Sequence, residues 1–220
     1  AQWYGPFDPS EVNFNYTEAN SWQYSLYAPQ HIELLTQLLG GPDSLETWLD
    51  RLFTTDMKLS GREQADITGL IGQYAHGNEP SHHMAYLYNF TNAPYKTQFY
   101  VDRILKEMYQ NAPDGLAGNE DCGQMSAWYV LSTLGLYPIA PGKPVYQIGR
   151  PNINSATIRL ENGKSIQIKC NNQSATNCYV QAVLWNGQSL SDLQISHEQL
   201  MQGGLLQFEM GASPQKPAVK

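Results

Sequence analysis

The chain has 220 residues, of which 41% are apolar and 15% charged, so it is long enough for a sizeable core and too apolar for a disordered protein. Its net charge is −7 and its basic residues are scattered, which argues against a nucleic-acid-binding surface. No stretch approaches the roughly 18 apolar residues of a membrane span. The first residues lack the pattern of a signal peptide, so the chain is expected to be cytosolic, mature or cut from a longer protein.

Two adjacent segments near the N-terminus have apolar residues at helical spacing. Residues 29–41 predict a helix that ends in a glycine pair suited to a C-cap. Its apolar face consists of Ile32, Leu35, Leu38 and Leu39. Residues 42–53 predict a second helix, for which Asp43 or Ser44 is the expected N-cap.

Three further helices are predicted before residue 140. One starts after Pro80, and another occupies residues 94–110, where a proline opens the helix. The apolar face of this second helix consists of Val101, Ile104, Leu105 and Met108. The last helix lies within residues 123–138 and is closed by a glycine and a proline. Helices at this spacing are expected to pack as antiparallel pairs.

The composition changes near Pro141, where three prolines fall within eleven residues. Beyond this point the sequence contains short apolar or alternating segments of strand length. These predicted strands are residues 155–160, 165–170, 178–185 and 205–210. The stretches "ENGKS" and "WNGQS" place Asn-Gly between strand-like segments, which predicts two hairpins.

The predicted fold class is therefore α+β. Residues 1–140 form the helical part, residues 141–212 an antiparallel β segment resembling one layer of a sandwich, and residues 213–220 a disordered tail. Cys170 and Cys178 could meet across a hairpin and form a disulfide, but free buried thiols fit the sequence equally well. No Cys-x-x-Cys pair indicates a structural zinc site.

Three polar clusters lie on loops between the predicted helices. They are "NYTEANSWQY" (15–24), "HGNEPSHH" (76–83) and "GNEDCGQ" (118–124). Each places a carboxylate just before a helix or an aromatic run, where it could simply cap the helix. The surrounding Asn, Gly, Trp and His residues make a functional role at least as attractive as a cap.

The residues of these clusters do not fit a zinc site, a nucleophile elbow or a phosphate-binding loop. His82 and His83 are adjacent and point apart on a helix, so a shared zinc ion is not expected. The oxygen-bearing side chains suit a hard cation better, and they are Asn78, Glu79, Asn119, Glu120 and Asp121. No nucleophile elbow or phosphate-binding loop occurs, and the neighbouring Asp121 disfavours a thiolate at Cys122.

Carboxylates on separate loops among aromatic residues are typical of glycoside hydrolases, which use one protonated carboxylic acid and one ionised carboxylate. Glu18 lies between Tyr16 and Trp22, whose rings would raise the pKa of a nearby carboxyl group. Asp121 follows another acid on a glycine-flanked turn that leaves room for a water molecule. The sequence thus offers carboxylates suited to this chemistry, on loops that lie far apart in the chain.

Three long motifs make the resemblance to a known family specific. "YTEANSWQYSLYAPQHIELL", "GQYAHGNEPSHHMAYLYNFTNAPYKTQ" and "DGLAGNEDCGQMSAWYVLSTLGLYP" together resemble glycoside hydrolase family 92, strongly over residues 4–151 and more loosely beyond. This family contains calcium-dependent, exo-acting α-mannosidases that invert the anomeric centre. Its catalytic domain is an (α/α)6 toroid that follows a β-sandwich domain. The resemblance implies that residues 1–140 are part of such a toroid and that the upstream β domain is the missing intramolecular partner.

The resemblance also assigns residue roles. Glu18 is the expected general acid and Asp121 the base, while Asn119 stands where some members have a second Asp. Glu79 resembles a residue of the calcium site, with Asn78 and His82 beside it, and it is the alternative candidate for the acid. The expected substrate-binding residues are Trp22, Asn119, Glu120 and His83, with Tyr24 and Trp3 as further aromatic walls.

The expected function is hydrolysis of mannose-containing glycans, with α-1,2 linkages preferred. The isolated chain is expected to be inactive because half of the toroid would be absent. The resemblance places the full-length protein outside the cytoplasm, as a secreted, periplasmic or cell-surface enzyme. Two alternatives stay open: a sugar-binding or structural segment without catalysis, and an (α/α)6 glycosidase of different specificity.

Overall fold

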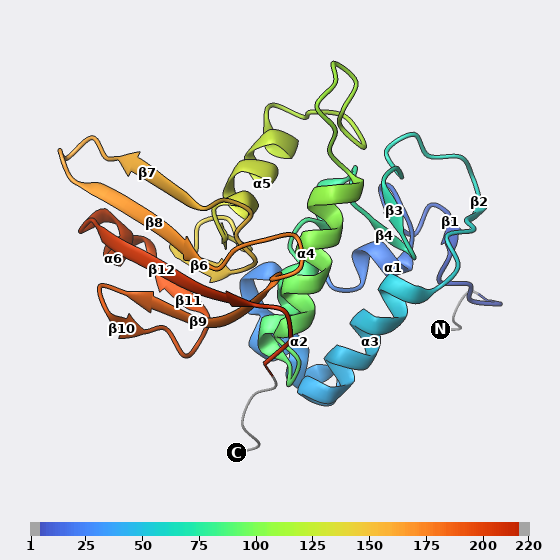
Figure 1. The fold of residues 1–220 in the computed structure, drawn as a ribbon. Helices are drawn as coiled ribbons and strands as arrows, with labels where there is room; N and C mark the ends of the chain where they lie inside the picture. Colours follow the sequence, from blue (N-terminus) through green and yellow to red (C-terminus); the bar gives the residue numbers. More distant parts are fainter. Residues whose placement is uncertain (1–4, 216–220) are drawn as a thin grey trace.

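A computed structural model describes residues 5–215 as a mixed α and β structure, with helices first and strands last (Figure 1). The α-helices are α1 (Ser21–Tyr24), α2 (Ile32–Leu38), α3 (Pro42–Thr54), α4 (Tyr95–Glu107), α5 (Gln124–Thr133) and α6 (His197–Met201). Shorter 3-10 helices are η1 (Pro29–His31), η2 (Glu79–Ser81) and η3 (Met84–Phe90). Within residues 5–215, no helix is both long enough and apolar enough to cross a membrane.

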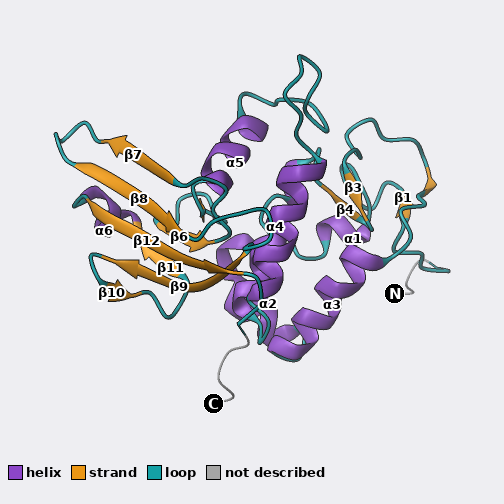
Figure 2. Ribbon diagram, viewed as in Figure 1, coloured by secondary structure: helices purple, strands orange, loops and turns teal. Residues whose placement is uncertain are grey.

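The strands form four small sheets, coloured orange in Figure 2. Two are two-stranded pairs among the N-terminal loops: β1 (Glu11–Val12) with β2 (Ser60–Gly61), and β3 (Leu70–Ile71) with β4 (Tyr74–Ala75). A three-stranded sheet has the order β11 (Gln194–Ser196), β6 (Val145–Ile148), β5 (Leu136–Tyr137). A five-stranded sheet has the order β10 (Gln188–Ser189), β9 (Tyr179–Trp185), β12 (Gly204–Gly211), β8 (Ser165–Asn171), β7 (Ser155–Arg159).

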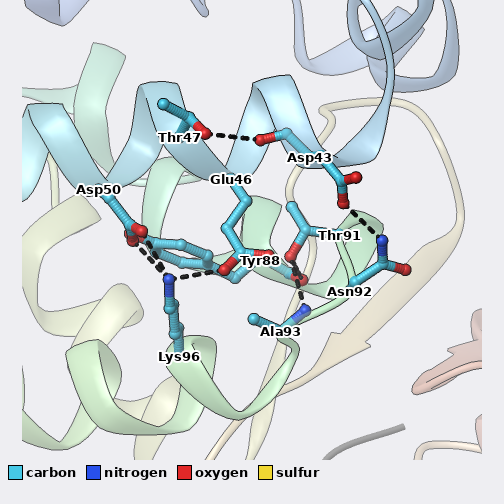
Figure 3. A network of polar contacts seen from close by, with 9 residues as sticks. All are labelled: Asp43, Glu46, Thr47, Asp50, Tyr88, Thr91, Asn92, Ala93 and Lys96. Carbon is cyan, nitrogen blue, oxygen red and sulfur yellow. Dashed lines mark hydrogen bonds and ion pairs between the residues drawn. The ribbon is translucent and has the colours of Figure 1, made fainter. Parts of the chain in front are cut away.

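Helices α3 and α4 pack as an amphipathic pair around the main helical core. The predicted face of α4 is confirmed for Val101, Ile104 and Leu105, which are buried, while Met108 is the C-cap and only partly buried. The buried face of α3 consists of Leu45, Leu49, Leu52 and Phe53. At the edge of this core, Nζ of Lys96 lies 2.7 Å from Glu46 and 2.6 Å from Asp50 (Figure 3). Tyr88 also donates to Asp50, over 2.9 Å, so polar contacts tie α4 and η3 to α3.

Two local predictions for these helices are wrong. The N-cap of α3 is Gly41 rather than Asp43 or Ser44, because Pro42 already provides the first helical residue and Gly41 adopts a φ of 106°. In α2 the expected apolar face holds only in part, since Ile32 is buried but Leu38 is 77% exposed. The helix ends at Leu38, so this side chain projects beyond the packed face.

The α-helix predicted after Pro80 is also wrong, because the chain there forms the 3-10 helices η2 and η3. Residues 84–88 of η3 are all fully buried, whatever direction their side chains take. An amphipathic α-helix would leave one face exposed, whereas this segment is surrounded by the core. This segment therefore lacks the exposed polar face of an amphipathic helix.

Both Asn-Gly hairpins are confirmed, since β7 pairs with β8 and β9 with β10 in antiparallel register. The expectation of a purely antiparallel segment is wrong, because β12 runs parallel to β8 and antiparallel to β9. The chain enters β12 through Gly204 beside Ile166, near the start of β8, and must run in the same direction. Strand β12 thus fills the gap between the two arms of a wide β8–β9 hairpin. The cysteines of the chain are free thiols.

Buried polar contacts join the helical part to the β part. Backbone N–H of Val180 in β9 donates to Oε1 of Gln98 in α4 over 2.9 Å. The guanidinium of Arg150, which is 1% exposed, lies 3.0 Å from the carboxylate of Asp102 in α4. Strand β5 precedes residue 141 but pairs with β6, so the three-stranded sheet takes strands from both sides of that position.

The Asp102→Asn variant should lower the free energy of unfolding by about 3 kcal/mol, because Arg150 would keep its buried charge without an anionic partner. The matched control on the same helix is Glu107→Gln, which removes only an exposed pair with Arg103. This control should cost less than about 1 kcal/mol. Denaturant unfolding of both variants would measure the difference, and equal losses would contradict the importance of the buried pair.

Candidate active site

Glu18 lies in the loop before α1, on a turn that the local sequence fixes. Asn20 caps α1 through a reciprocal pair of hydrogen bonds with Gln23, and Ala19 adopts a left-handed φ of 60°. The hydroxyl of Tyr24 donates to Oε1 of Glu18 over 3.0 Å. Because Asn20 does the capping, the Glu18 carboxylate is not required by the helix and is held instead by Tyr24.

Asp121 lies at the end of the long loop between α4 and α5. The loop closes through three consecutive left-handed residues, Asp121, Cys122 and Gly123, with φ values of 49°, 58° and 88°. Glu120 provides the acceptor for the start of α5, since its carboxylate receives the backbone N–H and the hydroxyl of Ser126 at 3.0 and 2.8 Å. The capping role therefore falls to Glu120, and the Asp121 side chain is left available.

The second and third polar clusters meet at two glycines. A Cβ atom on Gly118 would lie 2.6 Å from Cα of Gly77, a distance that no side chain tolerates. The absence of side chains here lets the loop that carries Glu79 lie directly against the loop that carries Asp121. Glycine is thus required at these positions for close backbone approach.

Glu79 shows that the three acidic side chains converge. Burial raises the pKa of its carboxyl group, and the hydrogen-bonding contact and charge of Asp121 raise the pKa further, as does the charge of Glu18. Tyr24 lies near the same group. Burial raises the pKa of its hydroxyl, and the hydrogen bond and charge of Glu18 raise this pKa further, as does the charge of Glu79. Residues 18, 79 and 121, from three separate loops, therefore share one electrostatic environment.

A cavity of about 510 Å³ opens beside Glu79. Its size lies in the range of small-ligand sites, which hold roughly 300–1,000 Å³. Its polar and aromatic wall comes from Tyr27, Glu79, His82, His83, Gln124 and Tyr137. Apolar residues of α5 and of the segment after Tyr137 complete the lining. This combination of an apolar wall and a few convergent polar groups is typical of a ligand-binding site.

The histidines around the cavity are buried and neutral. Burial lowers the pKa of His82 and of His83 to about 4 in each case, and it holds the pKa of His76 well below the usual value. Nε2 of His83 lies 3.0 Å from the carbonyl of Leu26. His76 lies between the hydroxyls of Tyr74 and Tyr109, at 2.7 Å from each. The histidines serve here as fixed hydrogen-bonding groups.

The other predicted site residues occupy different places. His83 lines the cavity as expected, while Asn119 and Glu120 are exposed on the α4–α5 loop, with Glu120 engaged at Ser126. Trp22 packs its ring 5.4 Å from that of Trp48 and donates to Ser10, so it does not line the cavity. Trp3 lies outside the residues that the structure describes.

Sequence reasoning missed three cavity residues, Tyr27, Gln124 and Tyr137. Gln124 belongs to the third polar cluster and could have been found there, because it directly follows the acidic turn. Tyr27 and Tyr137 carried no signal in a chain with 14 tyrosines. Tyr27 is half exposed at the cavity, and its ring meets that of His83 edge to face at 5.8 Å.

The fit to calcium rests on oxygen donors at one place. The charge of Asp121 acts on the carboxyl group of Glu79, so these two carboxylates lie near each other, and the side chain of the neighbouring Asn78 carries an amide oxygen. Oxygen donors of this kind suit a hard cation. Within the described part of the chain, no group of three or more His, Cys, Asp or Glu side chains is arranged to hold a metal ion.

The chain matches one known protein family along nearly its whole length. Residues 1–212 match the family described as "Glycosyl hydrolase family 92 catalytic domain". The chain belongs to glycosyl hydrolase family 92. The suspected resemblance is thereby confirmed over nearly the whole chain.

Two solved structures of family 92 enzymes are similar to this chain along 98% of its length. One is a family GH92 α-mannosidase from Bacteroides thetaiotaomicron, with 38% identity and a TM-score of 0.87; the chain covers 28% of it. The other is a family GH92 inverting mannosidase from the same organism, with 32% identity and a TM-score of 0.84; the chain covers 30% of it.

One curated relative is an uncharacterized secreted glycosidase of the fungus Arthroderma benhamiae. It is 26% identical over 197 residues, which are 88% of this chain and 23% of the relative. The chain therefore spans less than a third of the length of each of these three proteins.

Stability should fall as the pH drops from 7 to 5, because His83 stays neutral in the folded protein down to a pKa of about 4. The unfolded chain takes up this proton near pH 6.5, so it binds more protons than the folded state between these two values. For His83 alone the loss at pH 5 is on the order of 1–2 kcal/mol.

The variant His83→Gln, whose amide can still donate to Leu26, should show a flatter decline between pH 7 and pH 5. The control is His31→Gln, at an exposed position, which should keep the slope of the unaltered protein. Unfolding free energies at the two pH values provide the measurement, and an unchanged slope in His83→Gln would contradict the assignment.

Proposed function

We propose that this chain forms part of the catalytic domain of an inverting, exo-acting α-mannosidase. The observation that carries the proposal is the mutual influence of the carboxyl groups of Glu18, Glu79 and Asp121, which come from loops separated by more than 40 residues. They lie beside a cavity of about 510 Å³ whose lining includes Glu79 but neither Glu18 nor Asp121. Family membership and the similarity to two bacterial mannosidases support the substrate class. The substrates are mannose-containing glycans, with α-1,2 linkages as the preferred type.

The reaction proceeds in one displacement. Glu18 protonates the departing glycosidic oxygen, while Asp121 removes a proton from a water molecule that attacks the opposite face of the sugar. Tyr24 holds one oxygen of Glu18, which leaves the other oxygen to face the leaving group. Inverting enzymes keep their two carboxyl groups about 6.5–9.5 Å apart, which leaves space for the water. Neutral histidines and apolar residues around the cavity limit competing proton transfer.

Glu79 and Asn78 are the residues proposed to hold calcium. A cation there would offset the repulsion between the carboxylates of Glu79 and Asp121, which, in addition to burial, raises the pKa of Glu79. Bound calcium would act as a Lewis acid that grips hydroxyl groups of the mannose. The alternative assignment makes Glu79 the acid, and the variants below distinguish these roles.

The proposal extends to the larger protein. Helices α2 to α5 would belong to an (α/α)6 toroid, with a β-sandwich domain upstream as intramolecular partner and the strands after residue 141 as a sandwich-like layer. This chain alone would then lack much of the substrate cleft and would be inactive. The description of the fungal relative as secreted supports a secreted, periplasmic or cell-surface location for the full-length protein.

In an enzyme that contains the whole catalytic domain, Glu18→Gln should lower kcat about 10²–10⁴-fold on mannosides with poor leaving groups, because protonation of that group is lost. Hydrolysis of a dinitrophenyl α-mannoside, which needs no protonation, should be much less affected. Asp121→Asn should impair both substrates, since the attacking water is the same.

The matched control is Glu107→Gln, an exposed carboxylate on α4 that should leave both rates unchanged. Equal losses on both leaving groups in Glu18→Gln would remove Glu18 as the acid. Faster hydrolysis of α-glucosides than of α-mannosides would favour the alternative specificity. Sugar binding without any hydrolysis would favour the non-catalytic alternative.

The Glu79→Gln variant should raise the calcium concentration needed for half-maximal activity, because one anionic ligand is lost. A shift of roughly 10–100-fold is expected, as for other substitutions that weaken metal sites. Activity measured across calcium concentrations after treatment with a chelator provides the test. A calcium dependence identical to that of the unaltered enzyme would exclude Glu79 from the site.

A further inference from the structure

The hydrogen bonds of His82 determine which of its ring nitrogens carries a proton. Nε2 lies 2.8 Å from the backbone carbonyl of His76, which can only accept, so Nε2 must be the protonated nitrogen. The ring is buried and neutral, with its pKa lowered to about 4. Nδ1 is therefore bare and must accept a hydrogen bond. The atom 3.0 Å away is Nε2 of Gln124, which donates it.

This contact fixes the orientation of the Gln124 amide. Its Nε2 donates one hydrogen to His82 and the other to the hydroxyl oxygen of Tyr137, which is 3.1 Å away. Both amide hydrogens are thus in use, and a flipped amide would face the bare Nδ1 with a second acceptor. Oε1 of Gln124 consequently points away from these partners, and it has no hydrogen-bond partner among residues 5–215.

Tyr137 provides a complementary group beside it. Its hydroxyl oxygen accepts from Gln124, and its own hydrogen has no acceptor within the described residues. Burial raises the pKa of this hydroxyl to about 12, so the hydrogen is retained. The ring is fixed by its position in β5 and by stacking on Tyr86 at 5.1 Å. Gln124 and Tyr137 both line the cavity that Glu79 lines.

We propose that Gln124 and Tyr137 form a hydroxyl-binding pair that determines sugar specificity in this cavity. A sugar hydroxyl is both donor and acceptor, so it can donate to Oε1 of Gln124 and accept from the hydroxyl of Tyr137, either alone or together with a neighbouring hydroxyl. The pair rests on the proposed glycosidase function and adds a specificity role to it. A substrate without the matching hydroxyl leaves these groups unpaired and is rejected.

The test uses an enzyme containing the whole catalytic domain and a set of aryl α-mannosides, each lacking one hydroxyl. The unaltered enzyme should lose about 10-fold or more in kcat/KM on at least one deoxy substrate, as expected for an unpaired hydrogen-bonding site. The Tyr137→Phe variant should lose activity on the parent mannoside through a higher KM. It should also narrow the difference in kcat/KM between the parent and that deoxy substrate by roughly 3-fold or more, because the donor is gone while Oε1 of Gln124 remains.

The matched control is Tyr86→Phe, which removes a buried hydroxyl bonded to Ser132 from the ring stacked on Tyr137. Tyr86 does not line the cavity, so this control should keep the discrimination of the unaltered enzyme even if its stability falls. Gln124→Met, which removes the free acceptor, should repeat the loss of discrimination and serves if Tyr137→Phe fails to fold.

Unchanged discrimination in Tyr137→Phe or Gln124→Met, with hydrolysis intact, would overturn this inference and leave the proposed reaction standing. An unaltered enzyme that discriminates against no deoxy substrate would overturn it as well. If the unaltered enzyme hydrolyses no α-mannoside, the proposed function itself fails, and the specificity role fails with it.

Discussion

The position of the His82 ring is the constraint on which the rest of the candidate site depends. Its Nε2 is bound by the carbonyl of His76, its Nδ1 by Gln124, and its own carbonyl accepts from the indole N–H of Trp128 at 3.0 Å. These bonds join the loop of Glu79 to α5 at buried atoms. Loss of any one would leave a buried polar group unpaired, which costs about 1–3 kcal/mol. The placement of Glu79 beside α5 follows from this requirement.

The proposed catalytic side chains do not cap helices, because neighbouring residues do so. Asn20 and Glu120 satisfy the free N–H groups at the starts of α1 and α5, so Glu18 and Asp121 need not. The cost appears in the backbone, where Ala19 and Asp121 take left-handed conformations at about 1–2 kcal/mol each for residues with a side chain. Strain of this kind is common at functional sites.

The sequence predicts those features that follow from local periodicity or turn chemistry. The helices α3 and α4, most of the apolar face of α4 and the two Asn-Gly hairpins are of this kind, and they agree with the structure. Features set by distant contacts were not predictable. Residues 84–90 form a 3-10 helix whose first five residues are buried by distant parts of the chain, and the insertion of β12 beside β8 creates a parallel pair. For the site, the three polar clusters were recognisable, but the cavity-lining role of Tyr137 depends on packing against Tyr86, far away in the chain.

The position of β12 between β8 and β9 also matters while the chain is being synthesised. A ribosome makes residues 165–185 well before residues 204–211, so the inner edges of β8 and β9 wait without a partner while the chain emerges. Unpaired strand edges readily join other chains. During translation these two edges are therefore exposed to aggregation until β12 pairs with them.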